Sequence, residues 1–457
     1  MERRKRFIFG IKDLDLLLGD ALQPETLLVI GGYPGTGKTT LASTMAYHNA
    51  GLGHKVLYIS FQETREKLFR NMKKLGIDLQ EPANKGLLRF VQLPVFTDPD
   101  SVSELISHIS GLVDKEKPEV IIIDSVTPLL MPTGNNIRAR GILQNFFYGI
   151  LKLTRGLTIL LSEVPLDVSS VELGSIEFVA DVMIILKHKI EGDLLVRELE
   201  VRKVRGAPIQ IAKIPFSITE GKGFRVYAPP ILSEIPAPNT EKKFVLPCEI
   251  LRRYFGPLYG GEIIYFTYPS DARPHRFFSF LQALTLLNNA KTLVISYRLS
   301  PQTLKHLLRE SKVYKKLELG QWMYAFNPSA YSFPELYSKE LEIIEEHKPD
   351  IVVYIGIDAY THWRAKQYVD LLRNQLLLLR KMGILVFRAG AYVDHETYLI
   401  NSTLSDIVVR CDYVRMGRRY REELYIWKFG KDPRILNEED LSYCWRNELP
   451  KLLNELR

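Results

Sequence analysis

A nine-residue loop near the start of the chain constrains the fold more than any other stretch. Residues 32–40 read GYPGTGKTT and fit the pattern G-x-x-x-x-G-K-[ST] without a gap. The apolar run from Leu27 to Ile30 predicts a strand that leads into the loop, and the segment from Thr39 to Ala50 predicts a helix that leaves it. Strand, loop and helix in this order favour a Walker A phosphate loop over a glycine-rich turn that matches by chance.

The residue types in the loop suit a nucleotide with its metal. Gly35 and Gly37 let the backbone curl so that its N–H groups face a β-phosphate, and the helix N-terminus adds partial positive charge. We expect Lys38 to reach the β- and γ-phosphates and the Thr39 hydroxyl to ligate Mg²⁺. The expected cofactors are therefore ATP and Mg²⁺. The residues expected to bind them are Gly32, Tyr33, Pro34, Gly35, Thr36, Gly37, Lys38, Thr39 and Thr40.

Apolar strands and helices alternate after the loop. The apolar strands are predicted at residues 56–60, 119–124, 158–162 and 182–186. Continuous apolar strands separated by helices indicate a parallel sheet covered on both faces, which is an α/β fold. Asp124 closes one of these strands, where a Walker B carboxylate is expected to hold Mg²⁺ through water.

The bulk composition is that of a cytoplasmic protein with no membrane partner. The formal net charge is +8 and the isoelectric point is near 9.1, with basic residues spread along both halves. No apolar stretch approaches the roughly 20 residues that span a bilayer, and no signal-peptide core is present. Cys248, Cys411 and Cys444 are few, odd in number and scattered. This pattern favours buried free thiols over a zinc site or a disulfide framework.

These motifs resemble those of the KaiC-like branch of the RecA ATPases. The resemblance begins at residues 9–20, FGIKDLDLLLGD. It continues through GYPGTGKTTLA, YISFQET, VIIIDSVTPL, TILLSE, FVADVMIIL and RELEVRKVRGAP, in the family's order, over about residues 7–227. The resemblance implies a RecA-like domain that hydrolyses ATP.

The resemblance also implies where the attacking water is oriented. In this family the strand after the first helix ends with one or two glutamates that orient it, and here those positions are Gln62 and Glu63. A glutamine can orient water but cannot take its proton, whereas Glu63 can do both. If only the first position faces the γ-phosphate, we expect slow hydrolysis and a site that acts more as an ATP-binding switch. Ser162 and Glu163 end the next central strand, where the family commonly has a polar sensor. Ordinary strand-end polar groups explain those two residues equally well.

A K-x-R-G motif implies an active site shared between subunits. In relatives it faces the nucleotide of a neighbouring subunit, and here it contains Lys203 and Arg205. Alternate residues on a strand share a face, and cations at the γ-phosphate stabilise the charge in transfer. The alternative is an exposed edge strand with ordinary basic residues. The catalytic interpretation requires a homo-oligomer, for which a hexameric ring is favoured over a dimer.

The hydrophobic pattern of the first half returns in the second half without its chemistry. A proline-rich joint at residues 229–238 separates the halves. Aligning Tyr268 with Tyr33 gives Asp271 for Thr36, Ala272 for Gly37, Arg273 for Lys38, Pro274 for Thr39, Arg298 for Gln62, Ile355 for Asp124, Lys428 for Lys203 and Gly430 for Arg205. A retained framework with lost catalytic residues indicates a degenerate repeat.

We therefore predict two tandem RecA-like domains, each a mostly parallel sheet covered by helices. Residues 1–228 carry intact Walker A and B motifs, residues 239–440 lack a phosphate loop, and residues 441–457 form a C-terminal helix. The apolar residues of that last segment recur at helical spacing, which favours a helix that caps the core over one that binds a partner.

Two functions remain open at this point. One is a regulatory ATPase whose nucleotide state controls assembly or the binding of an unidentified protein partner. The other is a RecA paralogue that acts on DNA in recombination or repair. Arg138 and Arg140 in the loop at residues 131–141 suit phosphate contact, but the loop at residues 165–178 carries only acidic charges. The acidic loop favours the regulatory function, and nucleic acid is not the favoured partner.

Overall fold

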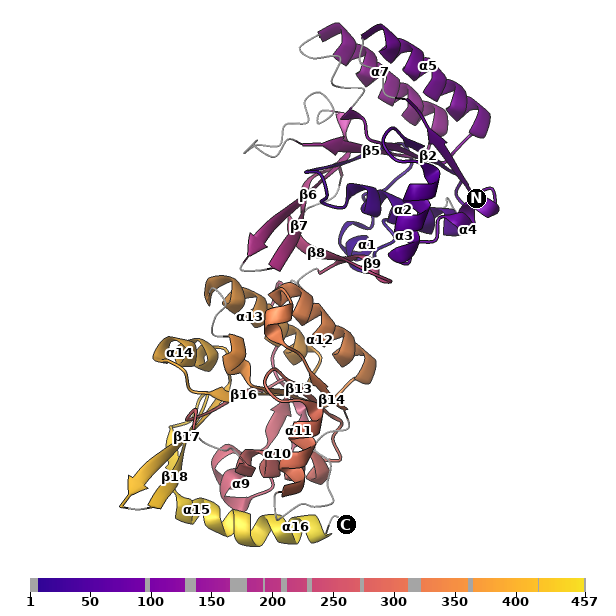
Figure 1. Ribbon diagram of the computed structural model, residues 1–457. Coiled ribbons are helices and arrows are strands. Elements are labelled where there is room, and N and C mark those ends of the chain that lie inside the picture. Colours follow the sequence, from indigo (N-terminus) through magenta and orange to yellow (C-terminus); the bar gives the residue numbers. More distant parts are fainter. Residues whose placement is uncertain are drawn as a thin grey trace. The chain divides into compact units, whose positions relative to one another are not determined.

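The chain divides into two compact units, Met1–Ala228 and Pro229–Arg457, which are described separately (Figure 1). The computed structural model describes residues 7–94, 99–127, 137–164, 179–191, 194–206, 212–227, 232–271, 275–310, 322–360, 365–417 and 419–455. The expectations for residues 165–178 and 272–274, and for the side chains of Arg138 and Arg140, lie outside this description.

The N-terminal unit is built on a sheet whose described strands have the order β3-β2-β4-β5-β1-β6-β7-β8-β9. The strands are β1 (Thr26–Gly32), β2 (Val56–Ser60), β3 (Leu88–Gln92), β4 (Val120–Asp124), β5 (Leu157–Glu163), β6 (Val182–Glu191), β7 (Leu194–Val204), β8 (Lys213–Thr219) and β9 (Gly223–Val226). The strands from β3 to β6 pair in parallel, and those from β6 to β9 pair antiparallel. Strand β1 therefore lies at the centre, between β5 and β6.

Helices cover both faces of this sheet. The described helices are α1 (Lys12–Leu18), α2 (Lys38–Gly51), α3 (Arg65–Lys74), α4 (Gln80–Asn84), α5 (Pro99–Glu116) and α7 (Ile137–Thr154). Leu28 and Ile30 of β1 pack in one core with α1 to α4, whereas Leu27 and Val29 pack in the other with α5 and α7 (Figure 1). Because both faces are covered, the strand is continuously apolar rather than alternating.

The second unit repeats this architecture. Its main sheet has the order β14-β13-β15-β16-β12-β17-β18-β19 among the described residues. The strands are β12 (Ile263–Tyr268), β13 (Thr292–Ser296), β14 (Trp322–Ala325), β15 (Ile351–Ile355), β16 (Leu385–Ala391), β17 (Ile407–Met416), β18 (Arg419–Lys428) and β19 (Arg434–Leu436), and β10 (Asn239–Phe244) pairs with β11 (Leu258–Gly260). The parallel part places β12 between β16 and β17, as β1 lies between β5 and β6.

The helices of the second unit also form two layers. They are α9 (Glu249–Phe255), α10 (His275–Leu287), α11 (Pro301–Glu310), α12 (Phe333–His347), α13 (Ala365–Lys381), α14 (His395–Thr403), α15 (Glu438–Tyr443), the π-helical turn η4 (Cys444–Glu448) and α16 (Leu449–Glu455). Those from α9 to α11, together with α15 to α16, pack on one face, and α12 to α14 pack on the other (Figure 1). Two α/β units with mostly parallel sheets confirm the predicted fold class.

A partly exposed carboxylate fixes the start of the central strand in each unit. The Leu27 amide donates to Asp181 Oδ2 at 3.0 Å, and the Ile263 amide donates to Asp406 Oδ2 at 2.8 Å. Asp406 also accepts two bonds from the Arg380 guanidinium, at 2.7 and 2.6 Å. The two units thus share a specific polar anchor as well as an apolar framework.

Backbone pairing shifts the sequence alignment of the two halves by one residue at the loop. Gly32 pairs with Glu163 at the end of β1, and Tyr268 pairs with Ala391 at the end of β12. Tyr268 therefore corresponds to Gly32, and the alignment of Tyr268 with Tyr33 is wrong. The sequence alignment matched Tyr268 with Tyr33 because both are tyrosines, but the strand pairing places Tyr268 at the position of Gly32.

The same shift affects the K-x-R-G segment. The Arg205 amide donates to Asp181 O and the Phe429 amide donates to Asp406 O, each at 2.9 Å. The counterpart of Arg205 is therefore Phe429 rather than Gly430. Lys203 pairs with Met183 as Trp427 pairs with Val408, so the proposed match of Lys428 with Lys203 is also wrong.

The expectation of three free thiols is wrong for two of the cysteines. Cys248 and Cys444 form a disulfide, and their Cα atoms are 5.5 Å apart. They are separated by 196 residues in sequence and meet only because the C-terminal helices fold back beside α9. Cys411 is free and buried, and burial raises its pKa to about 12.

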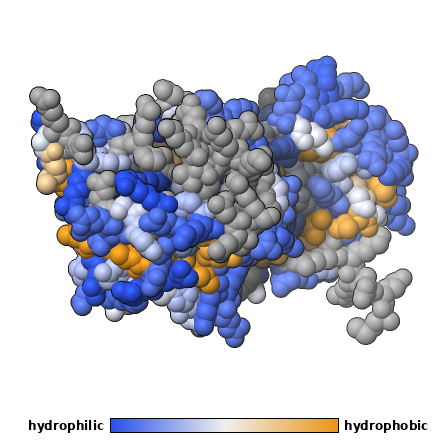
Figure 2. All heavy atoms as spheres, turned by 90° about the horizontal axis from the view of Figure 1, so that it is seen from below, coloured by the Kyte–Doolittle hydropathy of each residue, from blue (hydrophilic) through white to orange (hydrophobic). Residues whose placement is uncertain are grey.

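The surface shown in Figure 2 is mostly hydrophilic, with hydrophobic residues in small groups between hydrophilic ones. Within the described residues, no helix combines the length and the apolar character needed to cross a bilayer.

The carboxylate anchor gives a stability prediction for the second unit, which contains all four tryptophans of the chain. Asp406→Ala leaves the Ile263 amide without its acceptor and removes the carboxylate partner of the Arg380 guanidinium, so we expect the free energy of unfolding to fall by about 2–4 kcal/mol. Tryptophan fluorescence during urea unfolding measures this change. Asp412→Ala is the control because Asp412 pairs with Arg410 on the surface, where the loss should be below about 1 kcal/mol. Equal losses in the two variants would contradict the role of the anchor.

Candidate nucleotide-binding site

The phosphate loop lies between the end of β1 and the start of α2. Gly35 and Gly37 have φ angles of +75° and +103°, which side chains with a Cβ rarely adopt. The Thr36 hydroxyl donates to the Tyr33 carbonyl at 2.8 Å and closes the turn. A Cβ on Gly32 would lie 2.5 Å from the Leu186 carbonyl oxygen, so the strand below the loop also requires glycine.

Lys38 is held inside the loop. Its ammonium donates to the carbonyl oxygens of Gly32 at 2.9 Å and Tyr33 at 3.0 Å. Burial lowers the pKa of Lys38, and the charges of Glu163 and Asp124 oppose this change. The loop therefore holds a largely buried ammonium group, and the two nearby carboxylates stabilise its charged form.

The two predicted metal ligands lie in direct contact. The Thr39 hydroxyl donates to Asp124 Oδ2 at 2.9 Å, so the Walker A and Walker B residues meet at the carboxyl edge of the sheet. Burial raises the pKa of Asp124, while hydrogen bonds from Tyr58 and Thr39 oppose the rise. A hydroxyl beside a carboxylate is a donor set of hard oxygen atoms that fits Mg²⁺.

Sequence reasoning missed Tyr58 as a partner of Asp124. Its hydroxyl donates to the same Oδ2 atom at 2.9 Å, from the neighbouring strand β2. Tyr58 is fully buried, and burial together with Asp124 raises its pKa well above the usual value. The available signal was a phenol hydroxyl in the middle of the apolar strand VLYIS.

The candidate catalytic side chains diverge around the loop. Gln62 Nε2 donates to Glu163 Oε1 at 3.1 Å, and Glu163 lies beside Gly32 in the sheet. Glu63 Oε1 instead pairs with the Lys67 ammonium of α3 at 3.2 Å, although its charge still raises the pKa of Asp124. The structure thus joins Gln62 to Glu163 and turns the Glu63 carboxylate partly toward α3.

Lys203 and Arg205 lie away from the phosphate loop of their own chain. Lys203 pairs with Met183, and Met183 pairs with Val29, which stands three residues before the end of β1. Lys203 is therefore about 10 Å back along the strand direction and two strands across. Arg205 lies farther back still, near the level of Leu27. Arg205 is half exposed and donates to Asp181 Oδ1 at 3.1 Å.

The corresponding corner of the second unit holds other chemistry. Ile355 stands where Asp124 stands in the first unit, and Ala391 stands where Glu163 stands. Arg298, which replaces Gln62, places its guanidinium 3.6 Å from the Asp358 carboxylate. Asp358 also accepts from the Ala391 amide at 3.1 Å. The ion pair of Arg298 and Asp358, beside the apolar Ile355, thus stands where the first unit has its pair of oxygen ligands.

The strand order, the phosphate loop and the closing carboxylate define the N-terminal unit as a RecA-type P-loop fold. Residues 8–231 match the model of the KaiC ATPase family. The similarity to that family lies in the N-terminal unit, and the match covers just under half of the chain.

Three curated relatives match the same part of the chain. The circadian clock oscillator protein KaiC of Rippkaea orientalis is 29% identical over 222 residues, which cover 46% of this chain and 42% of the relative. That of Picosynechococcus sp. is 29% identical over 217 residues, covering 47% and 42%. The circadian clock protein KaiC3 of Synechocystis sp. is 26% identical over 227 residues, covering 47% and 44%. The match spans less than half the length of each of these relatives.

Proposed function

We propose that the N-terminal unit is a slow Mg²⁺-dependent ATPase whose nucleotide state controls assembly or the binding of a protein partner. The observation that carries the proposal is the hydrogen bond between Thr39 and Asp124 beside the buried ammonium of Lys38. It joins the metal-binding hydroxyl, the closing carboxylate and the phosphate-binding cation in one corner of the sheet. The match to the KaiC ATPase family supports the same chemistry.

Each residue of the corner has a separate task in binding. The backbone N–H groups of the loop and the N-terminus of α2 receive the phosphate oxygens. Lys38 exchanges the carbonyls of Gly32 and Tyr33 for phosphate oxygens, which gives it a charged partner. Thr39 and Asp124 would hold Mg²⁺, which neutralises phosphate charge when bound.

The hydrogen bond between Gln62 and Glu163 suggests how this site hydrolyses ATP without a glutamate at position 62. Gln62 orients the attacking water, and the Glu163 carboxylate accepts its proton. Glu63, the base proposed from the sequence, is the competing candidate because it lies close enough to influence Asp124. With the task divided between an amide and a carboxylate on different strands, we expect slow turnover.

Completion of the site by a second subunit is part of the proposal. Lys203 and Arg205 lie back from their own phosphate loop and two strands across, which favours their action on a nucleotide across an interface. This position supports a homo-oligomer, for which we favour a hexameric ring over a dimer.

The second unit supports a role in regulation rather than a second catalytic cycle. Arg298, Ile355, Ala391, Trp427 and Phe429 replace the candidate catalytic and metal-binding residues, while the carboxylate anchor and the apolar cores are kept. Retained packing without nucleotide chemistry suits a docking or scaffold domain. Capture of partners from native extract with and without ATP tests this role, and nucleotide-dependent retention of DNA alone would favour the alternative.

The first prediction concerns nucleotide stoichiometry. Lys38→Ala should abolish ATP binding because the charge partner of the phosphates is lost. Isothermal titration of the unmodified chain should give one nucleotide per chain. Lys55→Ala, on the surface beside β2, is the control and should bind normally. A stoichiometry of two would contradict the loss of the second site.

The second prediction separates the two candidate bases. Glu163→Gln should lower the turnover number by about 100-fold while ATP binding survives, because general-base catalysis is lost but the loop is intact. Glu66→Gln on the exposed side of α3 should leave turnover unchanged. Loss of turnover in Glu63→Gln, with Glu163→Gln unaffected, would assign the base to Glu63 instead.

The third prediction concerns the shared site. Arg205→Ala should bind ATP nearly normally but hydrolyse it poorly, because its cation acts mainly on charge in transfer. Mixing it with Lys38→Ala should restore part of the activity, since some interfaces then join an intact loop to an intact cation. Arg202→Ala is the matched control, because Arg202 directly precedes Lys203 on β7. Subunit exchange without recovered activity would place the cations outside catalysis.

A further inference from the structure

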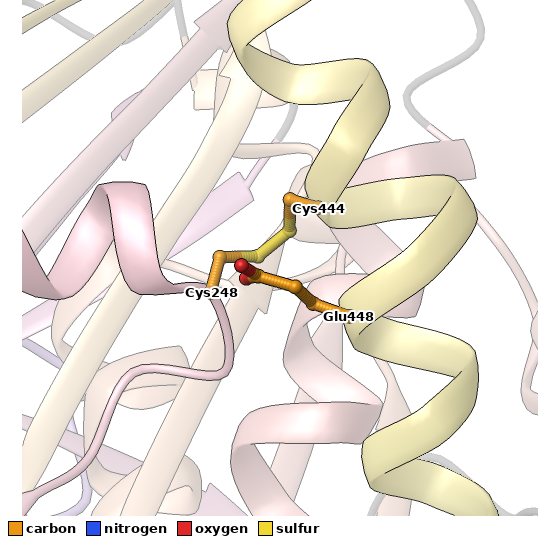
Figure 3. A group of neighbouring side chains, drawn as sticks. All are labelled: Cys248, Cys444 and Glu448. Carbon is orange, nitrogen blue, oxygen red and sulfur yellow. A yellow bond between two sulfur atoms is a disulfide. The ribbon is translucent and has the colours of Figure 1, made fainter.

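The disulfide between Cys248 and Cys444 joins the first helix of the second unit to its last helical segment (Figure 3). Cys248 is the residue immediately before α9, and Cys444 opens the π-helical turn between α15 and α16. Both residues are buried, with at most 1% of their surface exposed. The bridge therefore lies inside the packed unit, and its two cysteines come from opposite ends of that unit's sequence.

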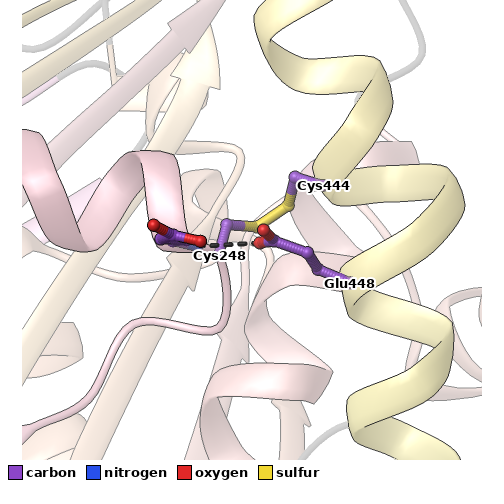
Figure 4. Close-up of a disulfide and its surroundings, with 4 residues drawn as sticks. Cys248, Cys444 and Glu448 are labelled. Carbon is purple, nitrogen blue, oxygen red and sulfur yellow. Dashed lines mark hydrogen bonds between the residues drawn. A yellow bond between two sulfur atoms is a disulfide. The ribbon is translucent and has the colours of Figure 1, made fainter.

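A hydrogen bond fixes the same two elements next to the sulfur atoms. The Glu249 amide, at the start of α9, donates to the Glu448 carboxylate at 2.8 Å (Figure 4). Glu448 lies one helical turn beyond Cys444, on the same side of the helical segment. The disulfide and this hydrogen bond thus join the same two elements, the start of α9 and the π-helical turn η4.

The joined elements also enclose apolar surface. Leu251 of α9 and Leu441 of α15 line one apolar cavity of about 100 Å³ against the sheet. Leu441 and Leu449 are each 1% exposed, so the helical segment at residues 438–455 covers the core of this face. Release of the segment would expose these leucines and open one wall of the cavity.

We propose that Cys248 and Cys444 are an oxidative modification site, a staple that holds the C-terminal helical segment at residues 438–455 against the second unit. Two thiols lose two protons and two electrons as the S–S bond forms, and a disulfide oxidant takes them up to become two thiols. A dithiol reductant reverses the same exchange. The staple closes a loop that spans 196 residues, and so removes much of the conformational freedom of this unit when it is unfolded. It is independent of the nucleotide chemistry proposed for the first unit.

Burial determines how the staple responds to reductants. A thiolate must reach one sulfur atom along the S–S axis, and both cysteines are buried where the helical segment packs beside α9. Reduction therefore requires the segment to open first. We expect dithiothreitol to reduce the folded chain at least tenfold more slowly than the same chain in urea, because opening limits the rate.

Thiol counting on the full chain tests whether the staple exists. The chain is purified without reductant, unfolded and alkylated, and then measured by mass spectrometry. We expect one alkylated cysteine, Cys411, and three after reduction. Cys411→Ser should then show none before reduction. Three alkylated cysteines in unreduced chain, or one bound zinc ion per chain that alkylation releases, would overturn the proposal.

A second measurement tests what the staple holds. Cys444→Ser should lower the thermal midpoint reported by tryptophan fluorescence by about 10 °C, since the loop-closure term is lost for a unit of this size. Hydrogen exchange should rise at residues 438–455, and Cys411→Ser should change neither readout. If Cys444→Ser does not fold, reduction of the unmodified chain provides the same comparison. An unchanged midpoint and unchanged exchange after reduction would overturn the role of the staple.

Discussion

The hydrogen bond from the Leu27 amide to the Asp181 carboxylate fixes where the central strand begins, and the nucleotide corner depends on that position. The last residue of β1, Gly32, lies five positions beyond Leu27 and pairs with Glu163 at the carboxyl edge. Strand pairing then carries the same register through β5 to β4, so Asp124 ends near the loop. A slip of one residue would turn each apolar side chain of β1 to the other face of the sheet. The register is therefore fixed by polar anchoring and by burial together.

The second unit shows which part of this arrangement can change without loss of the fold. Its anchor from Ile263 to Asp406 and its two apolar cores are kept, because they determine register and packing. In the first unit, Asp124 and Glu163 at the carboxyl edge belong to neither apolar core, so their chemistry can be replaced without loss of that packing. Ile355 in place of Asp124 even adds buried apolar surface. Fold and chemistry are thus carried by different positions of the same strands.

Much of the fold and of the loop could be predicted from the sequence because short-range patterns encode them. Apolar runs gave the central strands, and the glycines with Lys38 and Thr39 gave the loop. Side-chain contacts between neighbouring strands were harder to predict from the sequence. Tyr58 and Glu163 acquire their partners only when β2, β4 and β5 are placed side by side.

The errors share a physical cause, which is that side-chain identity was used where backbone geometry decides. Tyr268 and Lys428 matched residues of the first half by type, but the backbone hydrogen bonds place them one position away. Cys248 and Cys444 looked unrelated because 196 residues separate them, and only the return of the C-terminal helices brings them together.

Asp181 has a second consequence, because its carboxylate binds two elements at once. One oxygen receives the Leu27 amide at the start of β1, and the other receives the Arg205 guanidinium beyond the end of β7. Any change in the position of Asp181 therefore alters two hydrogen bonds at once, one to the strand that leads into the phosphate loop and one to the half-exposed Arg205.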